Sequence, residues 1–410
     1  MSARRGRTAC IVAVMLAALV LPSATATADP SMPTLTQVLP EVQQDGCRRA
    51  SGQTADQLSW ALLALRPDKA WPLSRGAGAT VAVVGSGVDD TSGALGSRLS
   101  LGPREYGSGS AGRDCVGHGT FLAGLIAARQ RAAAGFSGIA PDAAVIAVAV
   151  TDDAGTTNAD TLAKGIRAAS EAGAEIVLAG VPVPTASQSL VDAVRYAIGR
   201  GALVVAPTGP DGTGQGMTVY PAALPGVLAV SDIAATGVPS LSTPGGRVDL
   251  VAPGVGVVGT GPGGVGYFTA SGPSFAAAYV AGAAALVLGY RPELSGEQLR
   301  RRLLATAYRP GTALPDPFLG YGTVDPVAAV SATVPGENGD ALQVPAPAER
   351  LLLPRAADDA PARRATAVVG CSAVVVLVVV IAAVSLPRAR RRQWRPAAGP
   401  GPAPAPGIRS

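Results

Sequence analysis

The chain has 410 residues, and its 33 Lys and Arg outnumber its 28 Asp and Glu to give a formal net charge of +5. The positive excess lies at the two ends, because residues 1–28 hold three arginines, residues 387–410 hold six, and neither segment has an acidic residue. The rest of the chain is net acidic, so its charge gives no support to nucleic-acid binding as a function.

Residues 1–28 are predicted to be a secretory signal peptide. Arg4, Arg5 and Arg7 precede an apolar stretch from Ala9 to Leu21, and Ala26-Thr-Ala28 is typical of a cleavage site. A membrane anchor is the alternative, which the short apolar core disfavours. Residues 29–55 follow as an amino-terminal extension.

Residues 56–334 carry the pattern of one globular domain of the α/β class. Continuous apolar strands alternate with helical patterns, which favours a mostly parallel sheet covered by helices on both faces. The predicted strands are Thr80–Val84, Ala144–Val150, Glu175–Leu178, Leu203–Pro207 and Gly226–Val230. The predicted helices are Phe121–Arg131, Asp160–Ala172, Gln188–Arg200, Phe275–Leu288 and Glu297–Ala307. The last helix follows a capping-box pattern, Ser295-Gly-Glu-Gln298.

The carboxy-terminal part predicts a stalk and a membrane anchor. Residues 335–364 are rich in Pro, Ala and Arg, which is typical of a flexible linker. Residues 365–386 carry no charge and are long enough to cross a bilayer as a helix, although a buried core helix is the alternative. The arginines of residues 387–410 outnumber Arg363 and Arg364, which predicts a basic, disordered cytoplasmic tail and a domain outside the membrane.

The four cysteines predict one disulfide. Cys10 falls in the signal peptide and Cys371 in the predicted span, so Cys47 and Cys115 remain in an oxidising compartment. Two thiols in such a compartment most simply pair with one another. Two free buried thiols are the alternative.

Two residues are candidates for acyl-transfer chemistry. His118 is the only histidine of the chain, lies between Gly117 and Gly119, and precedes a helical pattern, so it is a candidate general base. Ser274 precedes an alanine-rich helix, where its N–H and the helix dipole favour developing negative charge. A structural histidine and a helix-capping serine are the plainer alternatives.

In their context, these residues resemble the motifs of the subtilisin-like serine proteases, the subtilases. Val81-Ala-Val-Val-Gly-Ser-Gly-Val88 is similar to their first block, Gly117-His-Gly-Thr120 to the second, and Gly272-Pro-Ser-Phe-Ala276 to the third. Further similar segments are Gly138–Asp142, Tyr220–Gly226, Val251–Gly254 and Gly320–Pro326. The resemblance covers about residues 71–330 and implies a three-layer fold with His118 and Ser274 as catalytic residues.

The architecture further resembles the mycosins, the membrane-bound subtilases of actinobacterial type VII secretion systems. This resemblance rests on the predicted signal peptide, the cysteine-bearing extension, the Asp114-Cys115 pair and the predicted membrane anchor. The resemblance implies an extracytoplasmic domain at the secretion membrane complex, peptide or protein substrates, and a role in holding that complex together. The sequence has no metal-ligand cluster or phosphate loop, so no cofactor is expected.

Four positions depart from the subtilase pattern. Gly85 occupies the position of the triad aspartate, Pro210 that of the oxyanion-hole asparagine, Pro273 that of the threonine before the nucleophile, and Gly180 that of a substrate-wall serine. In subtilisin, loss of the triad aspartate lowers turnover about 3 × 10⁴-fold and loss of one oxyanion donor about 10²–10³-fold. The sequence therefore predicts weak or absent peptidase activity.

Two hypotheses follow. In the first, the chain is an impaired subtilase that serves as a structural or peptide-binding component, and the His118 ring has no carboxylate neighbour. In the second, it is an active serine endopeptidase that processes secreted proteins, with a displaced carboxylate from Asp89, Asp90 or Asp114 orienting His118. An aspartate within hydrogen-bonding distance of the ring would overturn the premise of the first hypothesis.

Overall fold

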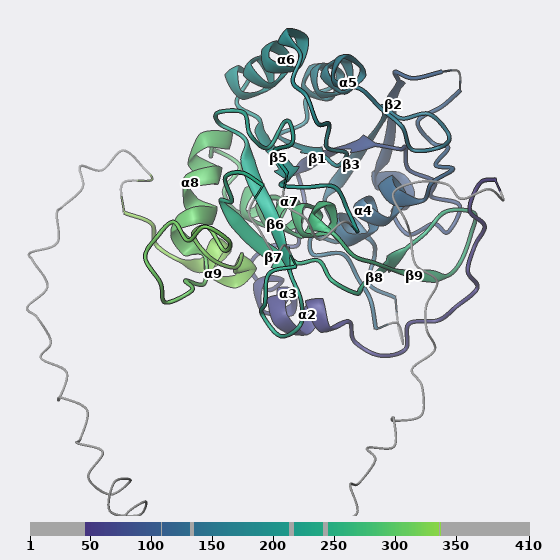
Figure 1. Cartoon of the computed structure of the whole chain (residues 1–410). Helices are drawn as coiled ribbons and strands as arrows, with labels where there is room; N and C mark the ends of the chain where they lie inside the picture. The colour runs from purple at the N-terminus through teal and green to yellow at the C-terminus, as the bar shows by residue number, and fades with distance from the viewer. Residues whose placement is uncertain are drawn as a thin grey trace, which may run out of the picture. The chain divides into compact units, whose positions relative to one another are not determined.

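A seven-stranded parallel sheet runs through the centre of the computed structural model, which describes residues 46–107, 109–131, 135–212, 217–240, 245–335 and 337 (Figure 1). The strands are β1 (Thr80–Gly85), β2 (Leu99–Arg104), β3 (Ala144–Ala149), β4 (Ile176–Ala179), β5 (Leu203–Pro207), β6 (Leu228–Ile233) and β7 (Leu250–Pro253). Their spatial order is β2-β3-β1-β4-β5-β6-β7, and every neighbouring pair is parallel.

Helices cover both faces of this sheet. Helices α5 (Ala159–Glu171) and α6 (Gln188–Gly199) lie side by side over one face, as Figure 1 shows, and α4 (His118–Ala127) and α7 (Pro273–Tyr290) pack on the other. Successive side chains of a strand point to opposite faces, so Val81 and Val83 of β1 join the core with α4 and α7, while Ala82 and Val84 join the core with α5 and α6. The predicted α/β fold is therefore confirmed.

The remaining elements lie around the sheet. They are α2 (Trp60–Leu65), α3 (Pro67–Ala70), a 3₁₀ turn (Gly96–Arg98), an antiparallel hairpin of β8 (Val257–Thr260) and β9 (Tyr267–Ala270), α8 (Gly296–Thr306) and α9 (Pro326–Ser331). The predicted capping box forms at α8, where the Ser295 hydroxyl accepts from the Gln298 N–H and the Gln298 side chain accepts from the Ser295 N–H.

Helix α7 is the central helix of the domain. It is apolar and long enough to cross a membrane, but 89% of its 18-residue apolar window is buried inside the fold. Its alanine-rich sequence allows close packing against α4 and the strands, so it is a core helix. The predicted signal peptide (1–28), transmembrane segment (365–386) and tail (387–410) lie outside the described residues, as does most of the predicted stalk (335–364).

A fully buried arginine joins α8 to the end of α9. The Arg302 guanidinium donates to the main-chain carbonyls of Ala329, Val330 and Ala332 and pairs with the Glu337 carboxylate. Helix ends leave carbonyls without intrahelical partners, and the guanidinium has enough donors for several of them. This cluster holds the last described residues of the domain against its core.

Candidate active site

The fold brings His118 and Ser274 together. His118 is the first residue of α4 and Ser274 is the second of α7, and the His118 Nε2 lies 2.9 Å from the Ser274 Oγ. The Asp114 carboxylate fixes the start of α4, because it accepts from the Gly117 and Thr120 N–H groups at 2.8 Å. The Phe275 ring meets the imidazole edge to face, with 5.2 Å between ring centroids.

Burial of this pair is almost complete. Ser274 has no exposed surface and His118 is 3% exposed. A serine nucleophile must reach the carbonyl carbon of a substrate. The closed surface at Ser274 therefore requires a local movement before any peptide bond could approach it.

A third residue, Asp211, enters the site from the turn after β5. Its Oδ2 lies 2.9 Å from the His118 Nε2, and its Oδ1 accepts the Ser274 N–H at 3.0 Å. The Ser274 hydroxyl also donates to the same carboxylate. Asp211 is 7% exposed, so these contacts form a closed, buried network.

Sequence reasoning missed Asp211. It assigned the oxyanion-hole position to Pro210, which lies one residue earlier. A polar side chain directly beside a position that has lost its polar residue was the available signal. The turn conformation between Pro207 and Asp211, which decides which side chain points inward, cannot be derived from the residue types alone.

The expectation that His118 has no carboxylate neighbour is wrong. The neighbouring carboxylate is nevertheless at Nε2, the nitrogen that has to take the serine proton, and not at Nδ1, where a triad aspartate acts. An Nε2 that donates to Asp211 cannot also accept from Ser274. Nε2 can therefore accept the serine proton only in the tautomer in which it does not donate to Asp211.

Asp211 also occupies the place where negative charge develops during acyl transfer. The Ser274 N–H is the main-chain donor of an oxyanion hole, and here it is already bonded to a carboxylate. An ionised carboxylate at hydrogen-bonding distance would repel a tetrahedral oxyanion instead of stabilising it. The Asp211 carboxylate thus contacts both the ring nitrogen that faces the serine and the main-chain donor of Ser274.

Gly272 provides the room for this carboxylate. Its φ is 150°, and a Cβ at this position would lie 2.0 Å from the Asp211 Oδ1. Only glycine is compatible with both the backbone conformation and the nearby carboxylate.

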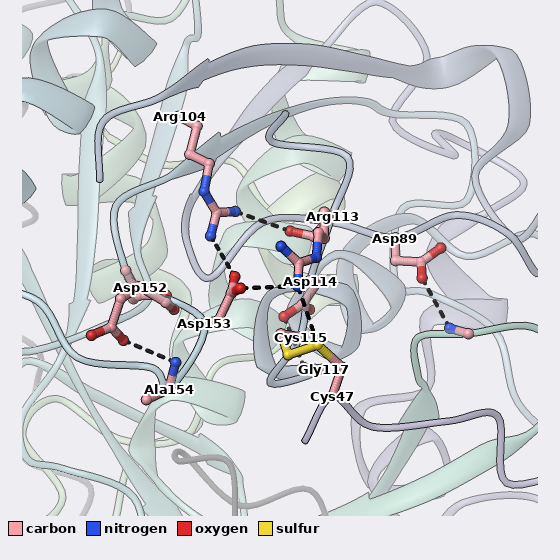
Figure 2. Close-up of a disulfide and its surroundings, with 12 residues drawn as sticks. Cys47, Asp89, Arg104, Arg113, Asp114, Cys115, Gly117, Asp152, Asp153 and Ala154 are labelled. Carbon is pink, nitrogen blue, oxygen red and sulfur yellow. Dashed lines mark hydrogen bonds and ion pairs between the residues drawn. A yellow bond between two sulfur atoms is a disulfide. The ribbon is translucent and has the colours of Figure 1, made fainter. Parts of the chain in front are cut away.

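The three carboxylates proposed from the sequence as replacements are bonded elsewhere. Their acceptor contacts are Asp89 with Thr91 and Gly263, Asp90 with Leu95 and Gly96, and Asp114 with Gly117 and Thr120. Figure 2 shows Asp89 and Asp114 among the residues around the disulfide. None of the three has a hydrogen bond to the imidazole. The carboxylates that the second hypothesis named therefore do not orient His118, and the carboxylate that contacts the ring is that of Asp211.

Gly85 is the last residue of β1, and the sequence comparison assigns it to the position where subtilases have the triad aspartate. No heavy atom outside its chain neighbours lies within 4 Å of a Cβ built on it, although the residue is buried. The His118 Nδ1 is a buried nitrogen without a hydrogen-bond partner among the described residues. Gly180 lies nearby, against the Leu122 side chain, and its N–H donates to the Val84 carbonyl at 2.9 Å.

A second buried carboxylate, Asp232, lies at the end of β6. Its pKa is raised to about 6, chiefly by burial and to a smaller extent by the Asp211 charge, against the lowering effect of the hydrogen bond from Ser240. Desolvation is the largest cause, because a charged carboxylate loses hydration when the fold excludes water.

The Cys47–Cys115 disulfide is present and joins the extension to the loop before His118 (Figure 2). Arg113, in the same loop, forms an ion pair with Asp153 at 2.9 Å, and Arg104 pairs with the same carboxylate at 2.9 Å. The extension continues along the β8–β9 hairpin, where the Tyr267 N–H donates to the Gln53 carbonyl at 3.0 Å. The loop that begins α4 is therefore fixed on two sides.

Within the part of the chain that the structure describes, no group of three His, Cys, Asp or Glu side chains could hold a metal ion. The chemistry available at the site comes from His118, Ser274 and Asp211.

Comparison with known proteins finds the same fold and the same family motifs. The family model described as "Subtilase family" matches residues 76–322. Mycosin-4 of Mycobacterium tuberculosis is 32% identical over 361 residues, which cover 75% of this chain and 77% of mycosin-4. The structure of the MycP3 protease from the type VII (ESX-3) secretion system is 31% identical with a TM-score of 0.62, over 75% of this chain and 98% of that one. A chain of the intact ESX-5 inner membrane complex is 27% identical with a TM-score of 0.63, over 87% and 97% of the two chains.

Proposed function

Because the chain belongs to the subtilase family and, within it, to the mycosins, we propose that it is a subunit of a type VII secretion membrane complex with impaired peptidase chemistry. Its role in this proposal is structural or peptide-binding. The likeness to a chain within the ESX-5 inner membrane complex supports the association with such a complex.

The observation that carries the impairment is the position of Asp211. Its carboxylate is bonded to the Ser274 N–H and hydroxyl and to the His118 Nε2, so all three groups that acyl transfer needs have another partner. The absence of an aspartate at Gly85 adds to this, since Nδ1 has no group to orient it among the described residues.

The proposed topology follows from the sequence. Residues 365–386 anchor the chain as a single membrane helix, residues 56–334 form the domain outside the cytoplasmic membrane, and the arginine-rich residues 387–410 remain in the cytoplasm. The extracytoplasmic domain would then face secreted proteins or their peptides.

The test separates catalysis from assembly in the producing cell. Deletion of the chain should abolish type VII secretion, whereas Ser274→Ala should restore secretion to the wild-type level, because the serine hydroxyl is not needed for a structural role. A matched control is Ser331→Ala, which removes an exposed serine hydroxyl of α9. Loss of secretion with Ser274→Ala alone, at normal protein levels, would refute the proposal.

A second candidate function is that of an active serine endopeptidase. The 2.9 Å contact between the His118 Nε2 and the Ser274 Oγ favours it, because serine catalysis needs a base within hydrogen-bonding distance of the hydroxyl. This function predicts labelling of Ser274 by a fluorophosphonate in the full-length wild-type protein, lost with His118→Ala. The proposed impairment predicts no labelling above that of Ser274→Ala.

A further inference from the structure

The space at Gly85 lies on the face of the sheet that carries His118. Side chains alternate along β1, so a side chain at residue 85 would point to the same face as Val81 and Val83. Those two valines belong to the core that α4 and α7 form. The buried space around the absent Cβ is therefore on the side of α4 and not on that of α5 and α6.

Helix α4 directs His118 toward this strand end. Residues four apart lie on one helix face, so His118 and Leu122 share a face. The Leu122 side chain packs against Gly180, whose N–H donates to the Val84 carbonyl at 2.9 Å. The residues next to Gly85 and His118 also meet, because the Gly119 N–H donates to the Ser86 hydroxyl at 2.9 Å.

The imidazole has one nitrogen in use and one without a partner. Nε2 contacts Asp211 and Ser274, while Nδ1, on the opposite edge of the ring, has no hydrogen-bond partner among the described residues. His118 is 3% exposed, so bulk water does not solvate this nitrogen freely. A buried polar atom without a partner beside an unfilled space is a site for a complementary acceptor.

We infer that the space between Gly85 and the His118 Nδ1 is a binding site for a small carboxylate such as formate or acetate. When both ring nitrogens carry a proton, Nε2 donates to Asp211 and an ionised carboxylate accepts the Nδ1–H in a charge-assisted hydrogen bond, which an apolar ligand could not do. The atoms of acetate correspond in number and kind to the aspartate side chain that Gly85 lacks. Binding is weak, since a ligand of three non-hydrogen atoms such as formate reaches a Kd no lower than about 0.5 mM.

This site does not depend on the proposed function. A carboxylate can bind at Nδ1 whether or not the chain hydrolyses peptides, because Asp211 contacts the other nitrogen. The test therefore uses the imidazole itself as the readout.

The presence of a single histidine makes that readout specific. The full-length chain, labelled with ¹⁵N-histidine, purified through a histidine-free tag and held in detergent micelles, gives the two ring nitrogens of His118 only. Sodium formate replaces sodium chloride at constant ionic strength. The Nδ1 resonance should move in a saturable manner and further than Nε2, acetate should do the same, and the bulkier pivalate should have no effect.

Two variants define the location of the site. Gly85→Asp fills the space with a tethered carboxylate, so its Nδ1 resonance should already lie near the formate-bound position and should not respond to formate. Gly85→Val fills the space without charge and should abolish the response without that initial displacement. Both variants are checked for cooperative thermal unfolding, and Gly85→Ser serves as the smaller filler where either does not fold.

Absence of any saturable movement of Nδ1 with formate in the wild-type chain would overturn the inference. So would an equal response to pivalate, or an undiminished formate response in folded Gly85→Val or Gly85→Ser. Each of these results would leave the secretion phenotype of Ser274→Ala, and hence the proposed function, unaffected.

Discussion

Two residues determine the chemistry of this site. Asp211 has a carboxylate that contacts His118 and Ser274, and Gly85 lacks the carboxylate that the subtilase pattern has at its position. Asp211 takes up the donors that a subtilase uses for the oxyanion, and Gly85 removes the group that orients the base. An asparagine at position 211 would keep the shape of the side chain, remove its charge and supply an amide donor. We therefore propose Asp211, the neighbour of Pro210, as the residue whose substitution should restore activity.

The double variant Gly85→Asp with Asp211→Asn should gain reactivity at Ser274. The first change fills an open position next to Nδ1, and the second removes the charge at the oxyanion site. Each lost part is worth at least about 10²-fold in subtilisin, so we expect an increase of about 10²-fold or more in the rate of fluorophosphonate labelling.

The matched control for this gain is Gly85→Asp with Asp192→Asn, which changes an exposed aspartate of α6. Equal labelling rates in the wild-type protein and in Gly85→Asp/Asp211→Asn would contradict the assignment of Asp211 as the obstructing group.

A second residue-scale prediction concerns pH. The Asp232 carboxyl loses its proton near pH 6 in the folded chain but near its ordinary pKa of 3.8 in the unfolded chain. The folded state binds more protons between these values, so stability falls as pH rises from about 4 to about 6, by about 3 kcal/mol in total. Asp232→Asn removes this loss, so its advantage over the wild-type chain should be small at pH 4 and about 1–3 kcal/mol at pH 7.

Thermal unfolding of both proteins across this pH range measures the effect. Asp192→Asn, at an exposed position, should give a difference from the wild-type protein that changes little with pH. An advantage of Asp232→Asn that is equally large at pH 4 and pH 7 would show that the carboxyl does not titrate between them.

The catalytic pair could be predicted from the sequence because short motifs specify it, whereas Asp211 could not. His118 and Ser274 each lie at the start of a helix within a conserved-looking glycine pattern, and the structure places them 2.9 Å apart. The conformation of the turn before Asp211 depends on contacts with Gly272, which is 61 positions away in the chain. The residue types of the turn do not reveal long-range contacts of this kind, although the polar Asp211 beside Pro210 marks the position as a candidate.

At the scale of elements, strands with a clear local sequence pattern were predicted and strands without one were missed. The five predicted strands are continuous apolar runs in the centre of the sheet, where burial on both faces requires such runs. Of the four described strands that were not predicted, β8 and β9 form the separate hairpin, and β2 and β7 lie at the two edges of the sheet. Strand β2 contains Gly102 and Pro103 within a half-exposed segment. Glycine and proline are typical of loops, so an edge strand that contains them resembles a turn.

Helix α8 offers an element-scale prediction through its buried arginine. Arg302→Leu should destabilise the domain by about 3–5 kcal/mol, because three helix-end carbonyls lose their donor and the buried Glu337 carboxylate keeps only its 3.3 Å ion pair with Arg291. The adjacent Arg301→Leu is the control, since its side chain is 62% exposed and its ion pair with Glu297 is long at 3.7 Å.

Urea unfolding of the two variants measures this difference. Arg301→Leu should lie within about 1 kcal/mol of the wild-type protein. Similar losses for both variants would mean that the burial of Arg302 contributes no particular stability.

At the scale of the whole molecule, the disulfide connects the extension to the catalytic loop. Cys47 and Cys115 are 68 positions apart, and closing a loop of this length in the unfolded chain corresponds to about 4 kcal/mol of stabilisation in the chain-entropy treatment. The sequence predicts a disulfide between Cys47 and Cys115 because both are expected outside the cytoplasm, and the structure contains this bond.

The variant Cys47→Ser with Cys115→Ser should therefore unfold at a lower temperature than the wild-type protein, with a loss of about 2–5 kcal/mol. Reduction of the wild-type chain should produce the same loss, and the double variant should not respond to the reductant. A wild-type chain whose unfolding temperature is unchanged by complete reduction would contradict this account.

The open position at Gly85 and the shape of Asp211 also bear on how the site can evolve. A Cβ at residue 85 meets no heavy atom within 4 Å outside its chain neighbours, and asparagine has the outline of aspartate. An aspartate codon becomes an asparagine codon through a single-base transition, and a glycine codon that ends in a pyrimidine becomes an aspartate codon through another. Both substitutions of the double variant therefore lie within reach of point mutation.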